Sequence, residues 1–111
     1  MARFNYVELP CSDIGASKQF YERAFGWTLA EFGPTYAATT TGDTDLGLQA
    51  DVVEAPRAPL AVIDVEDLEA ALEAVQRAGG RIVRPIFAFP GGRRFHFVDP
   101  SGNELAAVKA D

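Results

Sequence analysis

The sequence predicts an α+β fold made of two copies of one module, in which a strand and a helix precede three further strands. The first observation is an internal repeat at one constant offset, which pairs Asp13 with Asp67, Ile14 with Leu68, Arg23 with Arg77 and Gly26 with Gly80. The second is apolar residues at helical spacing after each aspartate. The third is a series of short apolar segments between glycine and proline turns after each helix. Since each half alone would leave an apolar face uncovered, we expect one domain over residues 1–111, with modules at about 1–53 and 58–111.

The first module begins with an alternating segment, residues 4–10, that predicts a strand ending at Pro10. Asp13 is the expected N-cap of a helix over about residues 14–25, and Gly26 is the expected left-handed stop. Turn signals at residues 33–34 and 42–43 separate three short predicted strands, at residues 27–32, 36–41 and 46–50.

The second module repeats this order after a connection at residues 54–59 that contains two prolines. We expect a strand at residues 60–65, a helix capped by Asp67 and stopped by Gly79-Gly80, and strands at residues 81–85, around 93–98 and at 104–109. In each module the helix is expected to cover one face of the sheet and to leave the other face concave.

Composition narrows the possible partners. No apolar run approaches the ~20 residues of a membrane span, and a formal charge of −6 argues against non-specific binding to nucleic acid. Cys11 is the only cysteine, which rules out an intrachain disulfide and fits a reducing compartment. We therefore expect a cytoplasmic protein with neither a nucleic-acid nor a membrane partner.

Several motifs accompany the repeat, in a fixed order: Glu8-Leu9-Pro10 before Asp13-Ile14, then Phe20-Tyr21, Phe25-Gly26-Trp27, Val65-Glu66-Asp67-Leu68, Gly79-Gly80 and Phe97-Val98-Asp99-Pro100-Ser101-Gly102-Asn103. Together they resemble the glyoxalase, bleomycin-resistance and extradiol-dioxygenase superfamily, or vicinal oxygen chelate fold. The resemblance implies paired βαβββ modules that form a curved mixed sheet around a cavity, with helices on the outer face and usually a homodimer. It fixes no reaction, because the superfamily holds lyases, epimerases, dioxygenases, transferases and non-enzymatic drug binders.

The superfamily's enzymes hold one divalent metal through His, Glu or Gln side chains on the first and last strands of each module. Carried over by distance from the capping aspartates and the final turn, these positions fall on Tyr6, Gln49, Leu60 and Ala106. Leu60 and Ala106 cannot ligate a metal, and Tyr6 is an uncommon ligand for such metals. We therefore predict no metal and no other cofactor.

Side chains two residues apart on a strand share a face, which predicts what lines the cavity. On the first strand, Tyr6 and Glu8 face the cavity if Val7 and Leu9 face the helix. On the strand around residues 93–98, the apolar side chains of Phe95 and Phe97 face the helix, so Arg94 and His96 face the cavity. The full predicted lining is Tyr6, Glu8, Tyr36, Gln49, Leu60, Arg94, His96, Glu104 and Ala106.

Four of these residues, Glu8, Gln49, His96 and Glu104, allow more than one interpretation. They could form a displaced site for one divalent metal, or supply acid–base chemistry in which a partly apolar cavity raises the pKa of Glu8 or Glu104. Alternatively, the glutamates pair with Arg93 or Arg94, and His96 is a hydrogen-bonded strand residue.

Two aromatic segments are also open to interpretation. Residues 87–94 could be a lid whose arginines meet an anionic ligand group, or a plain hairpin with a solvated tip. Phe20, Tyr21 and Phe25 are expected in the core or an interface, and Trp27 between helix and sheet.

The sequence thus predicts a metal-free small-molecule-binding protein that sequesters its ligand. The alternative is a lyase, isomerase or dioxygenase-like enzyme that uses the displaced metal or the carboxylates.

Overall fold

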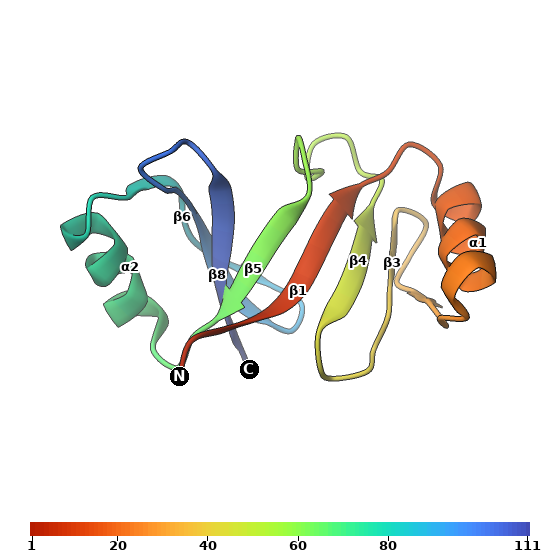
Figure 1. The fold of residues 1–111 in the computed structure, drawn as a ribbon, viewed down its shortest axis with the longest axis horizontal. Helices are drawn as coiled ribbons and strands as arrows, with labels where there is room; N and C mark the ends of the chain where they lie inside the picture. The colour runs from red at the N-terminus through yellow and green to blue at the C-terminus, as the bar shows by residue number, and fades with distance from the viewer. The chain divides into compact units, whose positions relative to one another are not determined.

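A computed structural model describes all 111 residues (Figure 1). The chain divides into two compact units, one formed by Tyr6–Leu60 and the other by Ala61–Asp111 together with Met1–Asn5. A strand, a helix and three strands follow one another twice along the chain, so the predicted α+β class and the repeated βαβββ order are confirmed. Neither helix is long and apolar enough to cross a membrane.

The first module contains strand β1 (Arg3–Pro10), helix α1 (Ile14–Phe25) and strands β2 (Ala30–Glu31), β3 (Tyr36–Ala38) and β4 (Asp45–Gln49). Its strands lie in the order β2-β3-β4-β1. β1 runs parallel to β4, whereas the pairs β2–β3 and β3–β4 are antiparallel. The result is a small mixed sheet in which β1 and the last strand are neighbours.

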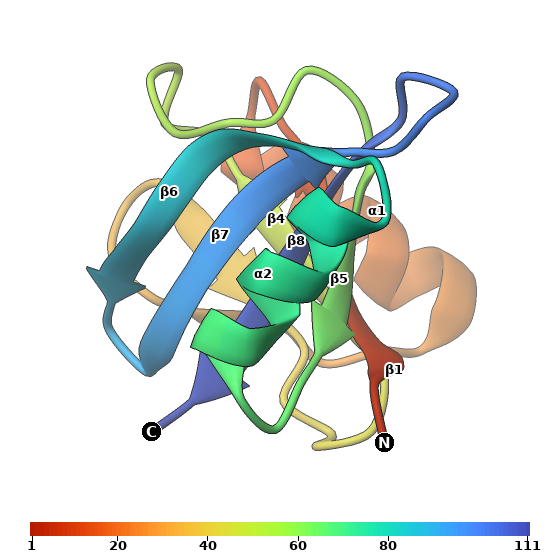
Figure 2. The ribbon, with the colours of Figure 1, turned by 90° about the vertical axis from the view of Figure 1, so that its left-hand side faces the viewer.

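The second module has the same connectivity. It contains β5 (Leu60–Asp64), α2 (Leu68–Arg77), β6 (Arg81–Phe89), β7 (Gly92–Val98) and β8 (Glu104–Ala110). The strand order is β5-β8-β7-β6, with β5 parallel to β8 and the other pairs antiparallel. Figure 2 shows α2 lying across this sheet, and it contacts β6, β7 and β8.

Both helices begin where the sequence predicts. The Asp13 carboxylate accepts a hydrogen bond from the Ala16 amide, and the Asp67 carboxylate accepts one from the Ala70 amide, each at 3.0 Å. Gly26 ends α1 with a φ of 71°. The end of α2 differs from the prediction, because Ala78 is its right-handed C-cap and the left-handed turn follows at Gly79, with a φ of 100°.

Two strands of the first module are shorter than predicted. Within the predicted strand at residues 27–32, only β2 (Ala30–Glu31) forms a strand. Within the predicted strand at residues 36–41, only β3 (Tyr36–Ala38) does. Asp45 explains the early end of β3, because its carboxylate binds the Thr39 hydroxyl, the Thr41 hydroxyl and amide, and the Gly42 amide at 2.7–2.9 Å. Although burial opposes them, these bonds hold the pKa of Asp45 below its usual value and organise a turn in place of a strand.

β6 is longer than predicted, since it continues through Pro85 to Phe89. Its place at the edge of the sheet explains why, because a proline there removes no necessary ladder bond. The register shifts between Arg84 and Phe87, around this proline. Residues 87–94, for which a plain hairpin was one of the two interpretations, form a hairpin whose turn lies at Pro90-Gly91, with a φ of 112° at Gly91.

Each helix packs on one face of its own sheet. In the first module the buried cluster is Leu29, Ala37, Leu46 and Leu48, with Leu9, Cys11, Ile14 and Tyr21 packed against it. In the second module it is Leu68, Phe95 and Ala107, surrounded by residues that include Leu72, Val75 and Phe97. The predicted face assignments of Leu9, Leu46, Leu48, Phe95 and Phe97 are thus confirmed, and the opposite faces carry the polar side chains.

Candidate functional site

The polar face of the first module is built on β1, β3 and β4. Strand register places Glu8 beside Gly47 and Tyr36 beside Gln49. Because neighbouring residues across a ladder share a face, these residues lie opposite the cluster that packs against α1. The predicted residues Tyr6, Glu8, Tyr36 and Gln49 therefore occupy one face of this sheet.

A chain of hydrogen bonds joins three of these side chains. The hydroxyl oxygens of Tyr6 and Tyr36 are 2.5 Å apart, and the Tyr36 hydroxyl donates to Glu8 Oε1 at 3.2 Å. A phenol has a single proton, so Tyr6 donates to Tyr36 when Tyr36 donates to Glu8. Glu8 is only 2% exposed. Burial raises the pKa of the Tyr36 hydroxyl far above its ordinary value of 10.0, and Tyr6 and Glu8 act in the same direction, so Tyr36 stays protonated.

Gly47 makes room for this contact. A Cβ atom at this position would clash with the hydroxyl groups of both Tyr6 and Tyr36. Gly47 is not among the predicted site residues, although a glycine inside a strand between two leucines signals a close approach by another group.

The side chain of Gln49 forms a hydrogen bond within the loop that follows β4. Its side-chain oxygen accepts a hydrogen bond from the Asp51 amide at 3.0 Å, and its backbone carbonyl accepts one from the Cys11 amide at 3.0 Å. The amide side chain thus organises the chain that leaves β4.

The polar face of the second module is centred on His96. In the register of β6, β7 and β8, His96 lies between Arg84 and Ala106. Its Nδ1 atom is 2.9 Å from Oε2 of Glu104. The ring is 7% exposed, and its Nε2 atom is buried without a hydrogen-bond partner.

Electrostatics keep this imidazole neutral. Burial lowers the pKa of His96 below its ordinary value of 6.5; the hydrogen bond to Glu104 opposes this shift, and the positive charges of Arg94 and Arg84 reinforce it. A carboxylate only accepts hydrogen bonds, so Nδ1 carries the ring proton and donates to Glu104. The lone pair of the neutral ring is then on Nε2.

Aromatic rings hold the two neighbouring arginines. The Arg84 guanidinium carbon lies 3.6 Å from the centre of the Phe87 ring, and that of Arg94 lies 5.3 Å from the same centre. The Phe87 and His96 ring centres are 5.8 Å apart. His96, Phe87, Arg84 and Arg94 therefore form one group on this face.

Glu104 bonds through Oε2 to His96. Arg93 forms two hydrogen bonds with Glu69 of α2, at 2.6 and 3.2 Å, on the helix side of the sheet. This pair lowers the pKa of Glu69 and raises that of Arg93. The interpretation of His96 as a hydrogen-bonded strand residue is confirmed for Nδ1. Its Nε2 atom has no hydrogen-bond partner.

The donor positions implied by the resemblance do not suit a divalent metal. Leu60 and Ala106 are 2% and 0% exposed and offer only hydrocarbon. No group of three or more His, Cys, Asp or Glu side chains is arranged to hold a metal ion. Of the displaced set, His96 contacts Glu104, Glu8 bonds to Tyr36 and Gln49 bonds to Asp51.

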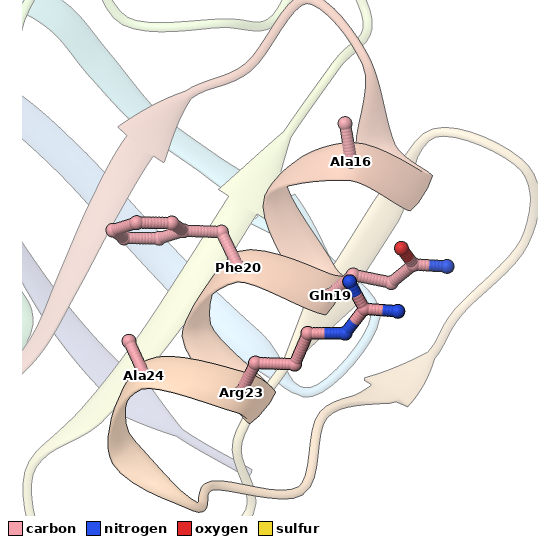
Figure 3. Close-up of a pocket in the computed structure, with 5 residues that line it drawn as sticks. All are labelled: Ala16, Gln19, Phe20, Arg23 and Ala24. Carbon is pink, nitrogen blue, oxygen red and sulfur yellow. The ribbon is translucent and has the colours of Figure 1, made fainter.

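Helix α1 carries an apolar surface that the sequence analysis placed in the core or an interface. Phe20 and Phe25 are each 59% exposed and Trp27 is 44% exposed. Trp27 stacks on Tyr21 and Phe25, with ring centres 5.9 and 5.2 Å away, so its predicted place between helix and sheet is wrong. A shallow groove of about 470 Å³ on this helix is lined by Ala16, Gln19, Phe20, Arg23 and Ala24, whose side chains are drawn in Figure 3.

Comparison with known sequences places residues 3–107 in the family described as the glyoxalase/bleomycin resistance protein/dioxygenase superfamily. A glyoxylase-like domain-containing protein of Didymella fabae is 32% identical over 114 residues, covering 90% of this chain and 88% of its own length. A Mycobacterium tuberculosis protein provisionally named glyoxylase CFP32 is 29% identical over 118 residues. This match covers 96% of the present chain but only 45% of the mycobacterial protein.

Solved structures show the same fold. A methylmalonyl-CoA epimerase from Mycobacterium tuberculosis aligns with a TM-score of 0.76 at 17% identity, covering 97% of this chain and 87% of its own. An Mn(II)-bound glyoxalase from Novosphingobium aromaticivorans aligns with a TM-score of 0.71 at 18% identity, covering 98% and 40%. At such identities the likeness concerns the fold and not the reaction.

Proposed function

The chain belongs to the glyoxalase/bleomycin resistance protein/dioxygenase superfamily, and we propose that it is a small-molecule-binding member that needs no metal and sequesters its ligand. The proposed binding residues are those on the sheet faces turned away from the helices. They are Tyr6, Glu8, Tyr36 and Gln49 in the first module and Arg94, His96, Glu104 and Ala106 in the second, with Leu60 at the start of β5.

One observation carries the metal-free part of the proposal. Two of the four positions that would supply metal ligands hold the buried hydrocarbon side chains of Leu60 and Ala106. At a third, the Tyr6 hydroxyl bonds to Tyr36. A divalent ion bound at these positions would have too few ligands to compete with water.

Metal analysis tests this directly. Protein purified without chelator is expected to contain substoichiometric Mn, Fe, Ni and Zn, and to gain no thermal stability when Mn²⁺, Fe²⁺, Ni²⁺ or Zn²⁺ is added. A stoichiometric metal that His96→Ala or Glu104→Ala removes would refute the proposal and establish the displaced metal site.

Ligand binding needs its own test. A thermal-shift screen of cationic and aromatic compounds is expected to yield stabilising ligands, because a ligand that binds only the folded state raises the unfolding temperature. The stabilisation should shrink in His96→Ala and persist in Gln76→Ala, which alters an exposed residue of α2. A screen without any stabilising compound would count against the binding function.

A second candidate function is favoured by the contact between His96 and Glu104. A histidine oriented by a carboxylate, with its other nitrogen not engaged in a hydrogen bond, is the arrangement of a general base, which a lyase or isomerase requires. The two functions are separated by following a bound compound by NMR, since a sequestering protein returns it unchanged and an enzyme converts it.

The proposal extends to assembly and location. The exposed aromatic residues of α1 support a homodimer. The single unpaired thiol, Cys11, supports a reducing compartment such as the cytoplasm. Light scattering coupled to gel filtration and imaging of a tagged chain test these two points.

A further inference from the structure

One exposed face of helix α1 differs in character from the same face of α2, its counterpart in the internal repeat. The groove on this face is lined by Ala16, Gln19, Phe20, Arg23 and Ala24. We propose that a second copy of this chain occupies the groove with its own α1, antiparallel to the first, so that each Phe20 ring lies against the Arg23 guanidinium of the other copy. This inference rests on the proposed homodimer and assigns its contact surface.

The internal repeat shows how the face of α1 departs from that of an ordinary solvated helix. Gln19 stands at the position that Glu73 has in α2, and Phe20 stands at that of Ala74. In α2, Glu73 lies 3.9 Å from Arg77, which is the usual ion pair between residues four apart on a solvated helix. In α1 the acid is lost and an aromatic ring is gained. Loss of carboxylates and gain of aromatic residues beside an arginine is the composition of a protein interface.

The arginine and the ring are both available for such a contact. No acidic residue lies three or four positions from Arg23 along the chain, and Arg23 forms no ion pair or ring contact within the chain. Phe20 is 59% exposed, and its ring meets the Tyr21 ring edge-on with the ring centres 5.0 Å apart. Tyr21 itself packs against the buried cluster of the first module. The Phe20 ring is therefore held in place in the single chain, which lowers the entropy cost of docking.

The central residues of the groove are spaced symmetrically along α1. Phe20 and Arg23 lie in the middle, and Gln19 and Ala24 lie one position outside them. Figure 3 shows Phe20 and Ala24 on one side of the helix face and Gln19 and Arg23 on the other.

This spacing makes the face complementary to itself. An antiparallel twofold pairing centred between Phe20 and Arg23 places each ring opposite the guanidinium of the other copy, which is a favourable cation–π contact made twice. The same operation sets each long Gln19 side chain against a short Ala24. A parallel pairing would set every residue against itself, so that two Arg23 cations would repel each other.

Other aromatic residues extend the surface beyond the groove. A stable interface buries about 1,000 Å² or more, so side chains outside the groove must take part. Phe25 and Trp27 are 59% and 44% exposed at the C-terminal end of α1. In the antiparallel pairing this end lies alongside the start of the other helix, where Gly15 and Ala16 are small enough to leave room.

Paired cysteines test the orientation of the helices, in a Cys11→Ser background that removes the only native thiol. Gln19→Cys and Ala24→Cys chains, one of them tagged, are co-expressed and oxidised. The pair is expected to give about tenfold more disulfide-linked dimer than either chain alone, because facing thiols react at a high effective concentration. In either chain alone, the two thiols are about 7.5 Å apart along the axis, and the gap between the helices takes their Cα atoms beyond the ~7 Å limit for a disulfide.

The matched control uses the same positions of α2. Glu73→Cys and Ala78→Cys chains, in the same background, should give no more linked dimer together than apart. Equal linking of the α2 pair, or linking of Gln19→Cys alone as strong as that of the mixed pair, would overturn the antiparallel α1 contact.

Substitution of Arg23 tests its contact with the ring. Arg23→Gln removes the cation and is expected to raise the dissociation constant of the dimer about tenfold, because the contact is made twice. Arg23→Lys keeps the charge and should retain most of the affinity, and Arg77→Gln is the matched change on α2 that should leave it unaltered. Phe20→Asp would not restore the contact, since a surface ion pair with Arg23 contributes little. Light scattering over a dilution series measures the constants, and an unchanged value in Arg23→Gln would contradict the assigned contact.

The outcomes separate this inference from the proposals on which it rests. A dimer that gives no mixed cross-link leaves the homodimer standing and overturns α1 as its contact surface. A chain that stays monomeric at micromolar concentration overturns both, and the groove would then serve a different partner. A mixed cross-link that is specific to α1 supports both. Small-molecule binding is tested separately by the thermal-shift screen.

Discussion

Gly47 is a small residue with a large structural consequence, because the hydroxyl groups of Tyr6 and Tyr36 occupy the space that a side chain would fill. Gly47→Ala is expected to destabilise the protein by about 1–3 kcal/mol, the usual cost of overpacking a buried site. Urea denaturation followed by circular dichroism measures this loss.

The matched control is Gly15→Ala in α1, where the new Cβ would meet only Asp13 Oδ1 at 3.6 Å. Since alanine favours a helix more than glycine does, this variant should be at least as stable as the original protein. Equal stability of the two variants would show that the tyrosine pair yields easily and that Gly47 is not required.

The sole histidine predicts a pH dependence of stability. Burial, first of all, lowers the folded-state pKa of His96 below its ordinary value of 6.5. Between 6.5 and the folded-state pKa, the unfolded chain therefore binds more protons than the folded chain, so the free energy of unfolding falls as the pH falls. The slope within this window is at most about 1.4 kcal/mol per pH unit.

Urea titrations between about pH 5 and pH 7.5 measure this slope, above the range in which ordinary carboxylates titrate. His96→Gln should flatten the curve. An NMR titration of His96 provides an independent check, and a midpoint at or above 6.5 would contradict the expected direction.

At the scale of elements, each helix is fixed at its start by an aspartate. Asp67→Ala is expected to cost about 1 kcal/mol, because the amide of Ala70 loses its acceptor at the N-terminus of α2. The neighbouring substitution Glu66→Ala leaves this cap intact and should cost much less. Thermal or urea unfolding of the two variants provides the comparison, and similar losses would contradict the role of Asp67.

The elements differ in how far the sequence could predict them. Helix starts were predictable because the signal is local: Asp13 and Asp67 bond to amides three residues ahead. The length of β6 was not, because Pro85 reads as a strand end unless it is known that β6 lies at the edge of the sheet. The end of β3 likewise depends on Asp45 reaching back to Thr39 and Thr41.

For the candidate site, the sequence predicts which sheet face each side chain occupies, but not which side chains contact one another. Residue alternation correctly separated the helix side from the polar side in β1, β4 and β7. The partners of the polar residues depend on strand register, which alternation does not give. Hence the bond between His96 and Glu104, the contact between the tyrosines and the need for Gly47 became visible only in three dimensions.

For the molecule as a whole, fold and metal chemistry are separable. Both modules keep the βαβββ order and the caps on which the fold depends. Two of the four expected ligand positions, Leu60 and Ala106, belong to the hydrocarbon core instead. The architecture of this superfamily is thus retained in a chain in which two of the expected ligand positions carry only hydrocarbon side chains.

The last prediction concerns assembly. If the homodimer forms through α1, Phe20→Asp should convert it to a monomer at micromolar concentration, because a charge would replace an aromatic ring that is 59% exposed in the single chain and buried in the dimer. Burying one such side chain contributes roughly 1.5–3 kcal/mol, so losing a symmetric pair outweighs the stability of a modest interface. Gln76→Asp on the exposed surface of α2 is the control and should remain dimeric. Light scattering after gel filtration gives the mass, and a dimer that survives Phe20→Asp, or an original chain that elutes as a monomer, would exclude this surface as the interface.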